Sequence, residues 1–258
     1  MSNLMSNYYP LEVTFSKGSG CWLTDTNGHE YFDALSGIGV VNLGHCHPAI
    51  TDTIIEQSKQ LLHTSNVYRI GNQEKLAARL CNMANMDKAF FSNSGAEANE
   101  AAIKITRLYA RSKKIQNPIV LTANQSFHGR TMTTISATGQ NKVQEGFAPL
   151  MSGFVHVNFD DISAIKKFSK NKDVVAVMVE PVQGEGGARK APDGYLKLLK
   201  EIALENGSLL ISDEVQIGMC RSGTLFAYEQ EEIEPDIIAL AKGLGGCFPV
   251  GAVMAKAE

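Results

Sequence analysis

The clearest indication of the fold comes from residues 174–214, which read VVAVMVEPVQGEGGARKAPDGYLKLLKEIALENGSLLISDE. An apolar run is followed by a glycine-rich loop, a segment with leucines at helical spacing, and a second apolar run. A strand without a polar face has to be covered on both sides, which is typical of parallel sheets in α/β proteins. The stretch therefore predicts a strand–helix–strand unit of a parallel sheet.

The same alternation continues towards both ends of the chain. We expect strands at 88–92, 118–123, 174–180, 208–213 and 236–241, and helices at 49–62, 94–114, 161–169 and 192–206. Near the N-terminus, within 13–33, turn signals stand at Lys17-Gly18 and at Asn27-Gly28, and the second pair predicts a hairpin. The expected fold class is α/β, with a mainly parallel, seven-stranded type of sheet and helices on both faces. In such sheets ligands bind beyond the carboxyl ends of the strands.

The composition narrows the class of partner. The chain has 258 residues, 44% hydrophobic and 20% charged, which is ordinary globular usage, and its formal net charge is −3. This balance gives no broad basic surface for nucleic acid or an anionic membrane, and no apolar run reaches the ~20 residues of a membrane span. The five cysteines are scattered, and the first ten residues lack the pattern of a secretory signal. We therefore expect a cytoplasmic protein with reduced thiols.

Three polar motifs follow predicted strands. Ser94-Gly95-Ala96-Glu97 combines the S-x-x-E pattern of a capping box with two small residues, so free N–H groups at a helix N-terminus could meet a phosphate. Phe127 and Arg130 could offer a stacking face and a carboxylate clamp. Glu185 lies in a glycine-rich loop at the rim of the expected site. Read singly, these motifs also fit a capped helix, a loop with a core phenylalanine and a plain connection.

Two strand ends carry the groups with the sharpest chemical implication. Asp213 continues the alternation of its strand and could face a protonated ring nitrogen, whereas Glu214 is expected to face solvent. Lys242 ends an apolar strand and precedes glycines, and a desolvated lysine amine can attack a carbonyl to form a Schiff base. The plain alternatives are a surface acid pair and a lysine that extends into solvent.

Other kinds of site are not favoured. His45-Cys46-His47 resembles a metal cluster, but consecutive residues on an extended stretch point apart, so we expect a loop leading into a helix and no metal site. The glycines from 243 to 251 do not form a dinucleotide fingerprint, and no G-x-S-x-G elbow of a serine hydrolase is present.

Taken together, the motifs resemble those of the fold-type I pyridoxal-phosphate enzymes, and more narrowly the class III aminotransferases, from about residue 7 to residue 251. Within that class the chain is most similar to the acetylornithine and ornithine aminotransferases. The resemblance is carried by Ser36-Gly37-Ile38-Gly39-Val40, Gly44-His45-Cys46-His47-Pro48, Phe127-His128-Gly129-Arg130 and Asp213-Glu214-Val215-Gln216.

The resemblance implies a role for each matching residue. Lys242 would carry pyridoxal 5′-phosphate and move the proton, and Asp213 would keep the pyridine nitrogen protonated. The remaining implied contacts are the phosphate at Ser94, Gly95 and Ala96, the ring faces at Phe127 and Val215, and the phenolic oxygen at Gln216. The substrate α-carboxylate would bind Arg130, and Glu185 would act as a gate that moves for a dicarboxylate such as 2-oxoglutarate.

The resemblance also implies an organisation and a reaction. Residues 1–46 would belong to a small domain, and residues 47–258 would form a large cofactor-binding domain that ends before the family's C-terminal domain, so we expect this chain alone to be impaired. Cys220 and Cys247 stand where glycines are usual. The implied reaction, in a homodimer, transfers the δ-amino group of N-acetylornithine to 2-oxoglutarate in arginine biosynthesis. The alternatives are an ornithine, succinylornithine or 4-aminobutyrate transaminase, a racemase or aminomutase of the same fold, and an inactive structural or regulatory fragment.

Overall fold

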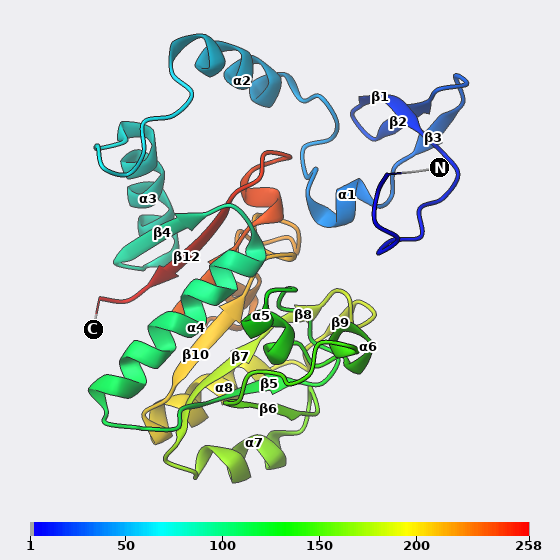
Figure 1. Cartoon of the computed structure of the whole chain (residues 1–258). Helices are drawn as coiled ribbons and strands as arrows, with labels where there is room; N and C mark the ends of the chain where they lie inside the picture. Colours follow the sequence, from blue (N-terminus) through cyan, green and yellow to red (C-terminus); the bar gives the residue numbers. More distant parts are fainter. Residues whose placement is uncertain (1–2, 258) are drawn as a thin grey trace.

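The computed structural model describes residues 3–257 and is built around a seven-stranded sheet in the order β4-β12-β11-β10-β7-β5-β6 (Figure 1). The strands are β4 (Lys88–Ser92), β5 (Ile119–Ala123), β6 (Phe154–Val157), β7 (Val174–Val179), β10 (Leu209–Asp213), β11 (Ile237–Leu240) and β12 (Gly251–Ala255). Neighbouring strands from β11 to β6 run parallel, and β12 is antiparallel to both of its neighbours. The expected mainly parallel sheet is confirmed.

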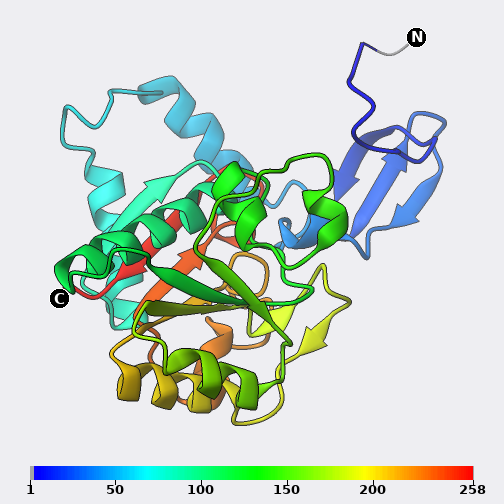
Figure 2. The same ribbon diagram turned by 60° about the horizontal axis from the view of Figure 1, so that its bottom comes forward.

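Helices cover both faces of this sheet (Figures 1 and 2). They are α3 (Gly71–Ala84), α4 (Gly95–Ser112), α5 (Met132–Ala137), α7 (Ile162–Ser169) and α8 (Tyr195–Asn206). The central strand β7 is buried along its whole length. Its Val177 and Val179 pack in one core with α3, α7 and α8, whereas Ala176 and Met178 pack in a second core with α4. The period-two division of one apolar strand between two cores is the arrangement that its uniform hydrophobicity predicts.

The predicted helices and strands within the two cores are present, with ends shifted by up to three residues. Helix ends follow local capping: Asp161 Oδ1 accepts the N–H of Ala164 at the start of α7, and Gly207 adopts φ +64° at the end of α8. Four of the larger elements were not predicted, namely α3, α5, β6 and β12. Helix α3 has Ile70 at its N-cap position, without a side-chain cap, so its start carries no sequence signal.

A separate three-stranded antiparallel sheet lies near the N-terminus, away from the large sheet in both views (Figures 1 and 2). Its strands are β1 (Phe15–Ser19), β2 (Trp22–Asp25) and β3 (Glu30–Phe32). The hairpin at Asn27-Gly28 is confirmed, with Gly28 at φ +88° between β2 and β3. The turn expected at Lys17-Gly18 is wrong, because both residues lie within β1 and the chain reverses at Gly20 and Cys21 instead.

The remaining elements complete the chain. They are α1 (Ser36–Gly39), α2 (Pro48–Gln60), α6 (Asn141–Gln144), the hairpin β8 (Val182–Gln183) with β9 (Arg189–Lys190), and the 3₁₀ helices η1 (Ala227–Glu231) and η2 (Lys242–Leu244). The loop at His45-Cys46-His47 leads into α2 as expected, and the His47 Nδ1 atom accepts the N–H of Ala49. Between residues 3 and 257, no helix is both long and apolar enough to cross a lipid bilayer.

Candidate active site

A cavity of about 530 Å³ lies at the carboxyl ends of the parallel strands, where the loops after β5, β7, β10 and β11 meet the start of α4. This is the edge at which ligands of open α/β sheets bind. All of the predicted site residues line this one cavity: Ser94, Gly95, Ala96, Phe127, Arg130, Glu185, Asp213, Val215, Gln216 and Lys242. Residues up to 148 positions apart in sequence are thus brought together, from Ser94 to Lys242.

The N-terminus of α4 forms one wall of the cavity. Ser94 Oγ accepts the N–H of Glu97 at 3.2 Å, so the predicted cap is present. In a capping box the Glu97 carboxylate would accept the N–H of Ser94, the N-cap residue. Here it accepts instead from Asn93, through the backbone N–H at 2.7 Å and the side-chain Nδ2 at 3.2 Å. Among the described residues, the N–H groups of Gly95 and Ala96 have no acceptor. Two donors at the positive end of an 18-residue helix therefore remain available to an anion.

Gly95 brings this helix end close to the opposite wall. A Cβ atom at residue 95 would lie 2.5 Å from Val215 Cγ1, closer than real Cβ contacts allow. The absence of a side chain at Gly95 therefore sets the separation between the helix N-terminus and Val215. Gly184 acts similarly on the other side, because a Cβ there would overlap the side-chain oxygen of Gln216.

The loop after β5 supplies an aromatic ring and a cation. Phe127 is half-buried, and the guanidinium carbon of exposed Arg130 lies 5.6 Å from the centre of its ring. On its other side Arg130 faces Tyr8, with 5.4 Å to that ring centre and a hydrogen bond to the Tyr8 hydroxyl. Sequence reasoning missed Tyr8, since no local pattern links residue 8 to residue 130.

Asp213, at the end of β10, is buried and held by three donors. Its Oδ2 atom accepts from Asn99 Nδ2 and His128 Nδ1, each at 2.7 Å, and its Oδ1 atom accepts the N–H of Val215 at 3.1 Å. Sequence reasoning singled out neither Asn99 nor His128 as a site residue, although both line the cavity. The signal available was the position of His128 inside the motif Phe127-His128-Gly129-Arg130.

The expectation for Glu214 is wrong. Its side chain does not face solvent but is almost fully buried, where its carboxylate accepts the N–H groups of Ala227 and Tyr228 and the hydroxyl of Ser212. Burial raises the pKa of Glu214 to about 7, against the lowering effect of these hydrogen bonds. Backbone donors in η1 supply the partners that make the burial of this acid tolerable.

Lys242 follows β11 and begins η2, with its backbone at φ +45°. Burial lowers the pKa of the Lys242 amine, whereas the charges of Glu185, Asp213 and Glu180 act in the opposite direction. A positive φ in a residue other than glycine is a strained conformation that is concentrated at functional sites. Because burial lowers its pKa, the Lys242 amine in this cavity is neutral in a larger fraction of molecules than an exposed lysine amine is.

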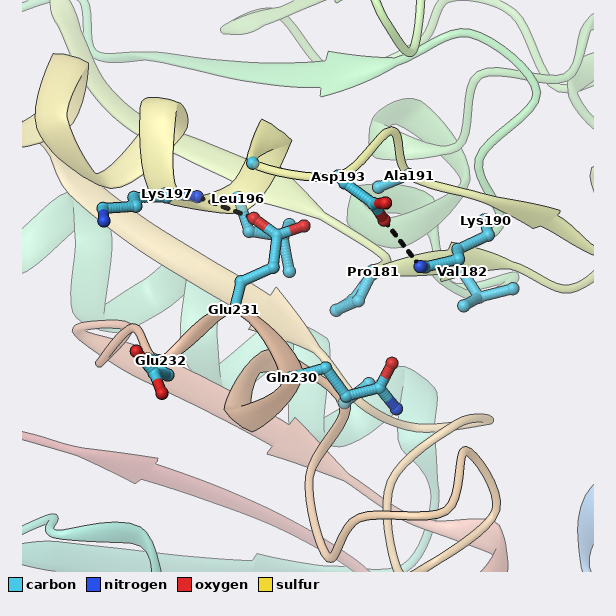
Figure 3. Close-up of a pocket in the computed structure, with 12 residues that line it drawn as sticks. Pro181, Val182, Lys190, Ala191, Asp193, Leu196, Lys197, Gln230, Glu231 and Glu232 are labelled. Carbon is cyan, nitrogen blue, oxygen red and sulfur yellow. Dashed lines mark hydrogen bonds and ion pairs between the residues drawn. The ribbon is translucent and has the colours of Figure 1, made fainter.

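A second hollow, of about 270 Å³, lies between the β8–β9 hairpin, the start of α8 and η1 (Figure 3). Three of its charged side chains have partners: Lys190 pairs with Asp193 at 2.7 Å, and Glu231 accepts the N–H of Lys197 at 3.1 Å. It contains none of the predicted site residues. The cavity around Lys242 is therefore the better candidate for a reaction centre.

The described residues do not contain a group of three or more histidine, cysteine or acidic side chains that could hold a metal ion. His45, part of the sequence that resembled a metal cluster, instead pairs with Asp33 at 2.7 Å between Nε2 and Oδ2. This pair lowers the pKa of Asp33 through its hydrogen bond to His45.

Comparisons with known proteins agree with this geometry. The family model described as aminotransferase class-III matches residues 4–258. The acetylornithine aminotransferases of Nitrosomonas europaea and Bacillus anthracis are 50% and 49% identical over 256 and 258 residues, which is 99% and 100% of this chain. The chain spans 65% of the length of each of these relatives.

Solved structures show the same similarity. An ornithine aminotransferase from Toxoplasma gondii superposes with a TM-score of 0.95 at 36% identity, covering 99% of this chain and 61% of that protein. Another structure of that enzyme has partial occupancy of PLP at its active site. An N-acetylornithine aminotransferase from Stenotrophomonas maltophilia superposes with a TM-score of 0.85 at 38% identity, covering 97% of this chain and 64% of that one.

Proposed function

The chain belongs to the class-III aminotransferase family, and we propose that it forms the cofactor-binding part of a pyridoxal-phosphate-dependent aminotransferase. The observation that carries this proposal is the convergence on one cavity of Lys242, Asp213 and the N-terminus of α4, where the N–H groups of Gly95 and Ala96 lack acceptors among the described residues. An amine, a buried carboxylate and an anion-binding helix end match the aldehyde, the ring nitrogen and the phosphate of this cofactor.

The residues of the cavity fit the cofactor. The N–H groups of Gly95 and Ala96 lack acceptors among the described residues, so they can bind the phosphate. Asp213 Oδ1 accepts a single described donor and has capacity for the ring N–H. Phe127 and Val215 would lie against the two faces of the ring, with Gln216 at its phenolic oxygen. When bound, the cofactor supplies an electron-withdrawing ring that stabilises negative charge on the substrate carbon.

Lys242 is the proposed catalytic residue. Its amine has a pKa lowered by burial, so Nζ can act as a nucleophile towards an aldehyde and can take up and return a proton. Asp213 has the complementary role, because its carboxylate favours a proton on the ring nitrogen.

Arg130 is the proposed site for the substrate α-carboxylate. It lies at the exposed edge of the cavity, between the rings of Tyr8 and Phe127, and its planar guanidinium suits bidentate binding of a carboxylate. The exposed Glu185 lies at the rim, and we assign to it the gate that responds to a dicarboxylate.

For the substrates, we propose transfer of the δ-amino group of N-acetylornithine to 2-oxoglutarate, which would place the protein in arginine biosynthesis. The support is the 44–50% identity to proteins named acetylornithine aminotransferase over nearly the whole chain. Ornithine, succinylornithine and 4-aminobutyrate remain the competing amino donors.

The test is a single half-reaction on stoichiometric protein loaded with pyridoxal phosphate, which is detectable even when steady-state turnover is slow. We expect N-acetylornithine to bleach the long-wavelength absorbance of the bound cofactor faster than the other three amines, and 2-oxoglutarate to restore it. Faster bleaching by one of the other amines would replace the proposed donor. Absence of bleaching by all four would remove the proposed activity.

We also propose a cytoplasmic homodimer. All five cysteines are free, which fits a reducing compartment. The segment after α2 exposes Leu62, Val67 and Tyr68, large apolar side chains of the kind that a second copy would cover.

A further inference from the structure

The carboxylate of Asp213 is surrounded by a buried polar cluster that the proposed reaction does not yet explain. Asn99 in α4, His128 after β5, Glu180 after β7 and Asp213 at the end of β10 are each at most 6% exposed. They come from four separate elements of the fold. Burying an ionisable group costs free energy unless hydrogen bonds or opposite charges compensate it. This cluster buries three ionisable groups and one amide, so each of them needs a partner.

Residue His128 is held in place through both its backbone and its imidazole ring. Its backbone N–H donates to Thr138 Oγ1 at 2.9 Å, and its carbonyl accepts from Asn99 Nδ2 at 2.8 Å. The same Asn99 nitrogen donates to Asp213 Oδ2, so one amide links the His128 backbone to the carboxylate. The ring itself contacts Asp213 Oδ2 through Nδ1 at 2.7 Å. The two donors to Asp213 Oδ2, Asn99 Nδ2 and His128 Nδ1, are therefore joined to each other by the hydrogen bond from Asn99 to the His128 carbonyl.

The protonation of the ring follows from these contacts. Because a carboxylate oxygen accepts, His128 must carry a proton on Nδ1. Burial by itself lowers the pKa of His128, but the hydrogen bond and charge of Asp213, together with the charge of Glu180, raise it overall. The neighbouring His156 on β6 has its own pKa lowered, mainly by burial. The titratable groups that face His128 are thus two acids and one histidine whose pKa is lowered.

We propose that His128 is a positioning residue for Asp213: its Nδ1–H donates to Oδ2 and fixes that oxygen, so that Oδ1 stays available to a donor in the cavity. Glu180 supports this arrangement from the other side, since its Oε2 atom accepts the N–H of Phe127 at 2.9 Å and anchors the loop that carries the histidine. The inference rests on the proposed function, because Asp213 is the carboxylate assigned to the ring nitrogen of the cofactor.

The first test needs no cofactor. In ¹⁵N-histidine-labelled protein, whose six histidines can be assigned with the His128→Asn variant, NMR gives the tautomer and pKa of His128. We expect an Nδ1–H resonance and a pKa above the ordinary value, and we expect Asp213→Asn to lower that pKa, because burial is then opposed only by the charge of Glu180. An Nε2–H tautomer, or a pKa that Asp213→Asn leaves unchanged, overturns the proposal.

The second test compares three variants by their affinity for pyridoxal phosphate. His128→Asn keeps a donor near the Nδ1 position without charge, His128→Leu removes the donor, and His156→Asn is the control in a nearby half-buried histidine whose recorded hydrogen bond is to Ala137 O. The loss of a charged hydrogen bond predicts a Kd about 10- to 100-fold higher for His128→Leu, an intermediate loss for His128→Asn, and no change for His156→Asn.

The two kinds of failure are distinguishable. If His128→Leu binds the cofactor as tightly as the parent, or if His156→Asn is impaired equally, the positioning role is wrong while the proposed function stands. If the parent protein itself binds no pyridoxal phosphate, the proposed function fails, and the NMR result still decides whether His128 Nδ1–H and Asp213 form the hydrogen-bonded pair.

Discussion

At the scale of single residues, the chemistry of the site was easier to predict than the surroundings of each group. Lys242 and Asp213 were expected in the cavity because each ends an apolar strand, and both line it. Glu214 has the same local context as Asp213, yet its side chain turns away from the cavity. Its partners are backbone N–H groups 13 and 14 residues further along, and no periodicity indicates such a contact.

Glu214 leads to a prediction about pH. Its pKa is about 7 in the folded protein and near 4.5 in the unfolded chain, so the folded state binds more protons between these values. Its contribution to stability is therefore complete below about pH 4.5 and is lost as the pH rises through 7. We expect the free energy of unfolding, from urea denaturation, to fall between pH 5 and pH 8.

The variant Glu214→Gln isolates this contribution. It removes the titration, so its free energy of unfolding should vary less with pH over this range than that of the parent. Its absolute stability should be lower by about 1–3 kcal/mol, since one backbone N–H loses its acceptor. An equally steep decrease in the variant would show that other groups, such as Glu180, cause the effect.

Cys247 gives a second prediction at this scale. It stands where the family resemblance implies a glycine, and its backbone has φ +121°, a region that side chains rarely adopt. We expect Cys247→Gly to raise the free energy of unfolding by about 1 kcal/mol, because relief of strain exceeds the entropy that glycine gains in the unfolded chain. The matched control is Cys21→Gly, at an exposed position without positive φ, where no gain is expected. Thermal denaturation of the two variants in parallel measures the difference. If both substitutions change stability equally, the backbone at Cys247 is not strained.

At the scale of elements, strongly patterned segments were predicted and weakly marked ones were not. Helices α4, α7 and α8 have clear apolar spacing, and α4 and α7 also have side-chain caps. The antiparallel strand β12 lies between β4 and β11, but its connection from β11 contains η2 and a glycine-rich segment and has no tight-turn signal of a hairpin. Its place depends on pairing with β4, about 160 residues earlier in the chain, which only the tertiary structure reveals.

The junction of β4 and α4 provides the prediction at this scale. Gly95→Ala places a Cβ atom 2.5 Å from Val215 Cγ1, so the helix end and the opposite wall must separate. We expect a loss of about 1–3 kcal/mol in unfolding free energy, the usual range for overpacking, and weaker binding of pyridoxal phosphate. Urea denaturation and fluorescence titration measure the two effects.

The matched control for this substitution is Gly71→Ala. Gly71 begins α3, and a Cβ there has nothing within 4 Å. We expect its stability to be unchanged or raised by up to about 1 kcal/mol, with unaltered cofactor binding. If Gly95→Ala behaves like Gly71→Ala, the close approach of α4 to Val215 has no energetic importance.

At the scale of the whole molecule, the parallel sheet explains why residues scattered through the sequence form one site. The loops after β5, β7, β10 and β11 all leave the same edge of the sheet, so Phe127, Glu185, Asp213 and Lys242 meet there. This convergence follows from the fold class and could be predicted. The contact between Tyr8 and Arg130 could not, because it depends on where the segment before β1 lies relative to the loop after β5. The division of the chain between residues 46 and 47 stays a prediction.

If the Lys242 amine binds the aldehyde of pyridoxal phosphate, borohydride reduction of the loaded protein fixes the cofactor on that lysine, and peptide mapping then locates it. We expect a pyridoxyl group on Lys242 in the parent protein and its loss in Lys242→Ala. A pyridoxyl group found instead on another lysine, such as Lys104 or Lys256, would contradict it.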